Sequence, residues 1–135
     1  MNRNRKVLTK LIAAGALLFV IAGCQTTASN NQDANAFTQI SDDQIAVLYG
    51  DKLEINDNFI VIDPDGTFSG SWSDALITGT WEMREDYWCR TLTKFHDASR
   101  IGQEDCQLLE VSADGSSVRG TRNKGEGSQF TYAVN

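Results

Sequence analysis

The sequence is poor in the residues and motifs of common catalytic sites. His96 is the only histidine among 135 residues, which leaves a poor set of ligands for a transition metal. There is neither a Walker-type glycine loop nor a G-x-S-x-G elbow. The acidic turn of residues 63–67 fails the EF-hand spacing, because Val61 stands where the first calcium ligand is needed. We therefore predict no catalytic residues, no metal site and no cofactor. An enzyme stays an alternative, because 18 acidic residues always allow some pair of carboxylates.

Positive charge is also scarce once the N-terminus is set aside. The chain has 12 basic and 18 acidic residues, and four of the basic residues lie within the first ten positions. Without residues 1–23, 8 basic residues remain against 18 acidic ones, a net charge of −10. This balance argues against nucleic acid and anionic lipid head groups as partners. An anionic ligand would meet the second half of the chain more readily, where the basic residues are Arg90, Lys94, Arg100, Arg119, Arg122 and Lys124.

The N-terminus has the layout of a secretory signal peptide. A basic region precedes the uncharged run Leu11–Gly23. As a helix this run would be about 20 Å long, too short for roughly 30 Å of hydrocarbon. The sequence IAGC of residues 21–24 resembles the lipobox of bacterial lipoproteins. The resemblance implies cleavage before Cys24, acylation of Cys24 with fatty acids such as palmitate, and anchoring in the cell envelope.

Gln25, rather than aspartate, follows this cysteine. In the enteric sorting rule, that pattern is similar to outer-membrane lipoproteins that face the periplasm. The alternative is an ordinary secreted protein with an incidental cysteine. The predicted organisation is a signal peptide (1–23), a lipidated cysteine with a flexible polar tether (24–40) and one small domain (41–135).

Two cysteines remain, Cys89 and Cys106. In an oxidising compartment an even pair predicts a disulfide. A reactive or metal-binding Cys89 is the functional alternative.

The domain begins with a predicted short helix, because Ser41 and Gln44 have capping-box spacing and Gly50 supplies a stop. One helical face would carry Ile45, Leu48 and Tyr49, and we expect it to cover the end of a sheet.

The rest of the domain predicts a mainly β fold. Short segments with period-two alternation are separated by turn signals such as Asp63-Pro64-Asp65-Gly66. No second helical pattern is long enough for a crossover, so we expect about eight antiparallel strands in a meander or barrel-like domain. Whether the sheet closes stays open. The predicted strands are Lys52–Asn56, Phe59–Ile62, Thr67–Ser73, Leu76–Met83, Tyr87–Lys94, Asp105–Ser112, Ser117–Asn123 and Ser128–Val134.

Two short motifs resemble those of known barrels. Gly79-Thr80-Trp81 is similar to the G-x-W of lipocalins, although theirs lies near the start of the barrel. The hairpin rhythm of NFIVIDPDGTFSGSW, residues 58–72, resembles avidin-like barrels. Both resemblances imply a small antiparallel barrel and carry no ligand contacts over to this chain.

Aromatic residues in successive strands suggest a ligand site. Aromatic faces beside an arginine suit a small apolar or anionic ligand. The predicted lining residues are Trp72, Trp81, Trp88, Arg90 and Tyr132. The alternative is that these tryptophans only fill the core, since an eight-stranded barrel has little internal space.

The predicted function is therefore a non-catalytic envelope lipoprotein that binds a small ligand or an envelope protein. A second hypothesis is an inhibitor or accessory subunit of an envelope enzyme or assembly. It would recognise its partner through the unpatterned loop Phe95–Glu104, with Arg100 and Gln103 as contacts.

Overall fold

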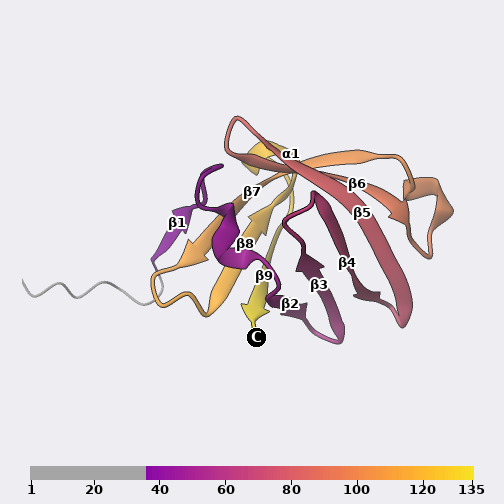
Figure 1. The fold of residues 1–135 in the computed structure, drawn as a ribbon, viewed down its shortest axis with the longest axis horizontal. Coiled ribbons are helices and arrows are strands. Elements are labelled where there is room, and N and C mark those ends of the chain that lie inside the picture. Colours follow the sequence, from indigo (N-terminus) through magenta and orange to yellow (C-terminus); the bar gives the residue numbers. More distant parts are fainter. Residues whose placement is uncertain (1–35) are drawn as a thin grey trace, which may run out of the picture. The chain divides into compact units, whose positions relative to one another are not determined.

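The computed structural model describes residues 36–135, which form a mainly β domain (Figure 1). The predicted fold class is confirmed, and all eight predicted strands are present. No helix within residues 36–135 is long and apolar enough to span a bilayer. The strands are β1 (Phe37–Gln39), β2 (Lys52–Ile55), β3 (Asn58–Ile62), β4 (Thr67–Trp72), β5 (Ala75–Arg84), β6 (Tyr87–Lys94), β7 (Glu104–Ser112), β8 (Ser117–Thr121) and β9 (Gln129–Val134). Three short helical turns are η1 (Ile45–Leu48), η2 (Ala98–Arg100) and α1 (Arg122–Gly125).

The sheet closes into a barrel of eight antiparallel strands. Each of the strands from β2 to β9 pairs with the next along the chain, and β9 pairs back with β2 at Leu53↔Val134. The meander therefore leaves no free edge between its first and last strands, which is how barrels avoid edge-to-edge association. This pairing answers the question of closure that the sequence left open.

β1 lies outside the predicted domain boundary, and its presence corrects that boundary. Phe37 and Gln39 were predicted as part of the flexible tether, but they pair with Ser112 and Glu110 of β7. β6 pairs with residues 104–107 of β7 and leaves the later residues on that side of β7 unpaired, so β1 can pair with residues 110–112. Ile40, which follows, is 1% exposed. The rest of the predicted tether (24–35), including Cys24, and the predicted signal peptide lie outside the described residues.

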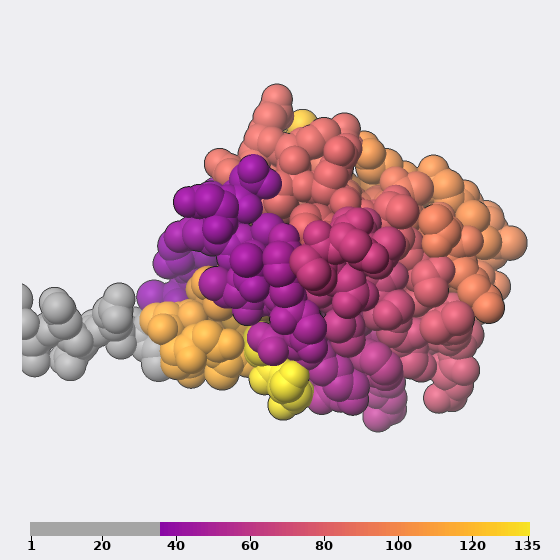
Figure 2. All heavy atoms as spheres, in the orientation of Figure 1, coloured from indigo at the N-terminus to yellow at the C-terminus, as the bar shows by residue number. Residues whose placement is uncertain are grey.

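The predicted N-terminal helix is present only as the short 3-10 turn η1, which begins at Ile45 instead of near Ser41. The backbone N–H of Gln44 donates to the carbonyl oxygen of Ser41 (3.0 Å), so residues 41–44 form a separate turn before η1, and the backbone N–H of Asp42 donates to Asp86 Oδ1 (3.0 Å) in the β5–β6 turn. Ile45 and Leu48 are both buried, as predicted, because residues three apart share a face of a 3-10 helix. In Figure 2 the indigo and purple atoms of this N-terminal segment lie directly against the rest of the barrel. The turn η1 thus closes one end.

The two ends of the barrel differ in what covers them. The closed end has β1, η1 and the β3–β4, β5–β6 and β7–β8 turns, and the chain also ends there, because Asn135 and Lys52 exchange backbone hydrogen bonds of 2.9 and 3.0 Å. The other end, which we call the mouth, has the β2–β3, β4–β5 and β8–β9 turns and the β6–β7 loop. Figure 1 shows β1 and the orange β6–β7 loop at opposite ends of the long axis.

Candidate functional site

A charged side chain lies inside the barrel near the mouth. On β6, Trp88 and Leu92 point inward and are 1% and 5% exposed. Strand alternation places Arg90, between them, on the same inner face. Its side chain is only 11% exposed. A buried arginine is uncommon in a small domain and needs an explanation, because the cost of burying an unpaired charge is high.

The groups around Arg90 stabilise its positive charge only in part, because none of them forms a close ion pair with it. Its guanidinium carbon lies 5.9 Å from the ring centre of Phe68 and 5.8 Å from that of Trp88, within reach of cation–π attraction. Its Nη2 is 4.0 Å from Asp105 Oδ2, at the outer limit of an ion pair. Burial lowers the pKa of Arg90, partly opposed by Tyr132 and Asp105, but a guanidinium stays protonated in proteins. The barrel thus presents a half-paired cation.

Three buried polar atoms near this point have no hydrogen-bond partner within residues 36–135: Trp88 Nε1, Arg90 Nε and Gln107 Oε1. Trp88 and Gln107 are direct cross-strand neighbours, as are Arg90 and Asp105. The amide of Gln107 donates to Asp105 Oδ2 (2.7 Å), so only its oxygen is left over. Nearly all buried polar groups in proteins are satisfied, so these three atoms are unusual. Of the three residues, Arg90 lines the cavities at the mouth, where a ligand could reach it.

Two cavities meet at Arg90 and Arg122. The polar cavity has a volume of about 220 Å³ and is lined by Arg90, Leu92, Arg100, Gln103, Glu104, Asp105 and Arg122. The second cavity has a volume of about 190 Å³ and is lined by Ile55, Trp72, Arg90, Arg122, Ser128, Gln129, Phe130 and Tyr132; we call it the apolar cavity for its aromatic wall, although half of its lining residues are polar. Both cavities therefore share two guanidinium groups in a chain that is otherwise strongly acidic.

The five predicted site residues do not all come together. Trp72, Arg90 and Tyr132 line the apolar cavity, and Trp88 lies beneath Arg90 in the core. Trp81 is elsewhere: its Nε1 donates to the carbonyl oxygens of Asp63 (3.0 Å) and Thr67 (2.8 Å), and its ring packs on Tyr49 near the closed end. It does not line the cavities around Arg90.

Sequence reasoning named the arginines of the polar cavity without separating them from the other basic residues, and it missed Leu92 and Phe130 as lining residues. Of the six basic residues in the second half, Arg90, Arg100 and Arg122 line the polar cavity. Arg119 points outward between the inward-facing Val118 and Gly120, and it forms a bidentate pair with Glu110 at 2.8 and 2.9 Å. Lys124 pairs with Glu85 at 3.4 Å. Alternation in β8 was the available signal for excluding Arg119.

The loop between β6 and β7 belongs in part to the mouth. Its turn η2 is capped by Asp97, whose Oδ1 accepts from the backbone N–H (3.0 Å) and hydroxyl (2.7 Å) of Ser99. Those hydrogen bonds lower the pKa of Asp97. The loop carries Phe95 and Arg100, which line a small space of about 20 Å³ beside Trp72. The guanidinium of Arg100 lies 5.3 Å from the ring centre of Phe95.

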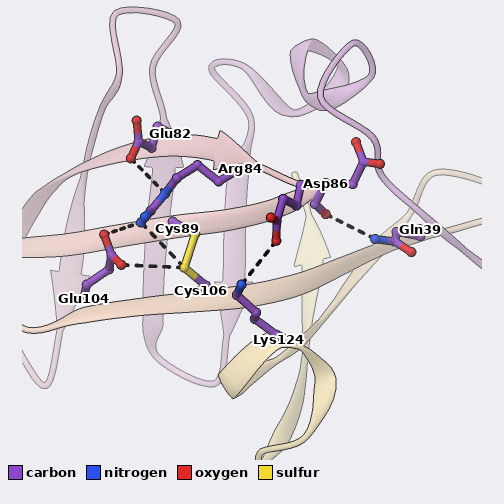
Figure 3. A network of polar contacts seen from close by, with 9 residues as sticks. Gln39, Glu82, Arg84, Asp86, Cys89, Glu104, Cys106 and Lys124 are labelled. Carbon is purple, nitrogen blue, oxygen red and sulfur yellow. Dashed lines mark hydrogen bonds and ion pairs between the residues drawn. A yellow bond between two sulfur atoms is a disulfide. The ribbon is translucent and has the colours of Figure 1, made fainter.

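A second polar cluster, on the outer wall, has its charges paired with one another (Figure 3). It surrounds the predicted disulfide Cys89–Cys106, which the structure confirms. Arg84 pairs with Glu82 at 2.9 Å and with Glu104, and its Nη2 lies 3.7 Å from Cys106 Sγ. These groups border a groove of about 440 Å³. Because its cations already have carboxylate partners, this cluster is the weaker candidate.

The mouth is therefore the candidate functional site. Within residues 36–135 no group of histidine, cysteine, aspartate and glutamate side chains is arranged to hold a metal ion. Comparisons of the chain with protein-family models, with curated proteins and with solved structures gave no match.

Proposed function

We propose that this protein is a non-catalytic binding module that takes a small anionic ligand with an apolar part into the barrel mouth. The observation that carries the proposal is Arg90, a cation with an 11% exposed side chain inside the barrel. Holding such an ion away from water costs on the order of several kcal/mol unless it is paired. Asp105 at 4.0 Å supplies only part of that pairing. An anion bound at Arg90 and Arg122 would complete it.

The aromatic wall supports the same proposal. Trp72, Phe130 and Tyr132 line the cavity next to the two guanidinium groups. Aromatic surfaces with a few placed polar groups are typical of small-molecule sites. Burial raises the pKa of the Tyr132 hydroxyl, so this hydroxyl stays protonated at neutral pH and leaves the positive charge of the site undiminished.

We expect Arg90→Gln and Arg122→Gln each to weaken binding of small anions by roughly tenfold to a hundredfold, the worth of a charge-assisted hydrogen bond. The measurement is isothermal titration of the chain from residue 25 with acetate, benzoate and phosphate. Arg119→Gln is the matched control, because it removes the same charge on the outer wall. If none of these anions binds the unmodified chain, or if all three variants lose affinity equally, the proposal fails.

We further propose that Cys24 anchors the protein in the cell envelope, with the barrel in the periplasm. The support is the lipobox-like sequence IAGC behind a basic region and an uncharged run. Cys24→Ser is expected to move the protein from the membrane fraction to the soluble periplasmic fraction, because multiple acyl chains supply the anchor. Fractionation followed by immunoblotting measures this shift. Membrane retention of Cys24→Ser would contradict the anchor.

An inhibitor or accessory subunit remains the second candidate, favoured by one observation. Ile101, in the β6–β7 loop, is 43% exposed. A partner that docks on this loop would be lost on Ile101→Asp, whereas binding of small anions would persist. Cross-linking in intact cells, compared between this variant and Arg90→Gln, separates the two functions.

A further inference from the structure

We infer that the ligand is a small monocarboxylate with a single aromatic ring, bound with its carboxylate inward at Arg90 and Arg122. This inference rests on the proposed function and names the ligand class of the same site. Its basis is the arrangement of the two cavities, which share these arginines but differ in the rest of their lining.

The direction of binding follows from the depth of the charges. Arg90 lies over the rings of Phe68 and Trp88, which are both 1% exposed. It is therefore the inner limit of the site, with the core beneath it. The charged end of a ligand must reach Arg90 to pair with it, so the apolar part stays toward Trp72 and Phe130. A ligand that entered with its apolar end first would place carbon atoms against the guanidinium of Arg90 and leave its charge unpaired.

The size of the apolar part follows from the volume of its cavity. The apolar cavity holds about 190 Å³, whereas pockets for drug-sized ligands have roughly 300–1,000 Å³. A cavity of about 150 Å³ is enough for benzene. A single aromatic ring is therefore the apolar group whose size matches this cavity. Its neighbours Trp72, Phe130 and Tyr132 offer ring faces and edges, and aromatic pairs gain attraction beyond the area that they bury.

The nature of the head group follows from Asp105. The planar fork of arginine matches both carboxylate and phosphate. However, Asp105 Oδ2 lies 4.0 Å from the same guanidinium and is held there by the amide of Gln107. A second negative charge on the ligand would be repelled by this carboxylate and would cost more to remove from water. A monoanion is therefore favoured over a dianion.

The experiment compares five probes on the chain from residue 25 by isothermal titration, with Trp fluorescence as a second readout. Phenylacetate should bind at least tenfold more tightly than acetate, because the ring is buried, and at least tenfold more tightly than phenylacetamide, which has no charge. Phenyl phosphate and dodecanoate should both bind more weakly than phenylacetate. Phe130→Ala should reduce the phenylacetate affinity to near that of acetate, while Arg119→Gln should leave it unchanged.

The outcomes separate this inference from the proposed function. If acetate binds as well as phenylacetate, or if phenyl phosphate binds more tightly, the mouth is an anion site but the ligand class is wrong. If dodecanoate binds most tightly, the occupant is a fatty acid and the size argument is overturned. If no probe binds, both the inference and the proposed function fail. Folding of Phe130→Ala is checked by circular dichroism, and Phe130→Leu, which keeps most of the volume, serves if Phe130→Ala does not fold.

Discussion

Gly70→Ala is expected to destabilise the barrel by at least about 3 kcal/mol, because the added methyl group would overlap backbone atoms, which cannot move aside as a side chain can. A Cβ on residue 70 would overlap the carbonyl oxygen of Phe59 and lie 2.8 Å from the Cα of Ile60. Both atoms belong to β3, the strand paired with β4 at this point. Relief would require β3 and β4 to separate, and their hydrogen bonds would be lost. Urea denaturation followed by far-UV circular dichroism measures the change in free energy of unfolding.

Two other substitutions calibrate that result. Ser69→Ala, one residue earlier in β4, should change the free energy of unfolding by less than about 0.5 kcal/mol, as surface substitutions usually do. Gly120→Ala should have an intermediate effect, because the three atoms nearest to its Cβ would all belong to the ring of Phe130, a side chain that can move more easily than backbone. If Gly70→Ala is no worse than Gly120→Ala, β3 and β4 are not as close as described.

Loss of the disulfide is expected to cost about 3 kcal/mol, the entropy of closing a loop of this size in the unfolded chain. Cys89 and Cys106 are directly opposed in β6 and β7 and are 17 residues apart in sequence. For a domain of about 100 residues, this cost lowers the melting temperature by more than about 10 °C. Differential scanning calorimetry of the double variant Cys89→Ala/Cys106→Ala measures it. The double variant avoids leaving one free thiol.

Chemical reduction provides the control for this prediction. The unmodified chain in a reducing agent should melt close to the double variant, because both lose the same cross-link. Arg84→Gln, which keeps the cross-link but removes the adjacent guanidinium, should melt within a few degrees of the unmodified chain, since exposed ion pairs contribute little. A double variant that melts with the unmodified chain would show that the disulfide adds nothing to stability.

The sequence patterns that succeeded were local ones. Period-two alternation with turn signals placed the strands, since both depend on neighbours along the chain. The inward position of Arg90 follows from the same alternation, between Trp88 and Leu92. The disulfide was predicted from the pair Cys89 and Cys106 together with the predicted oxidising compartment, and the structure contains it.

The predictions that failed concern the position of a residue along the barrel axis and the pairing of strands that are far apart in the sequence. Alternation assigns Trp81 to a face of its strand, but it does not say how far along the barrel the residue lies. Strands in a barrel are tilted and staggered, so Trp81 reaches the turn between β3 and β4 although its partner in β6 is Arg90. The strand β1 depends on a free stretch of β7 far along the chain, and no local pattern reports such an edge.

Arg122 shows a third kind of failure. It follows the last residue of β8, where the chain leaves extended geometry: Asn123 and Lys124 have φ of 51° and 53°. The predicted strand Ser117–Asn123 includes Arg122, and alternation from Val118 and Gly120 places Arg122 on the inner face. What alternation could not show is the turn at Asn123 and Lys124 that ends the strand. The turn brings it to Arg90 at the boundary of both cavities.

Both ends of the described chain lie at the closed end of the barrel, where β1 pairs with the end of β7 and Asn135 pairs with Lys52. A segment joined to residue 36 or to Asn135 is therefore joined to the end of the barrel opposite Arg90. If Cys24 carries the proposed anchor, the link to it joins the described domain at the end opposite Arg90. For the same reason, a sensor surface that captures the protein through a C-terminal tag would leave ligand exchange unhindered.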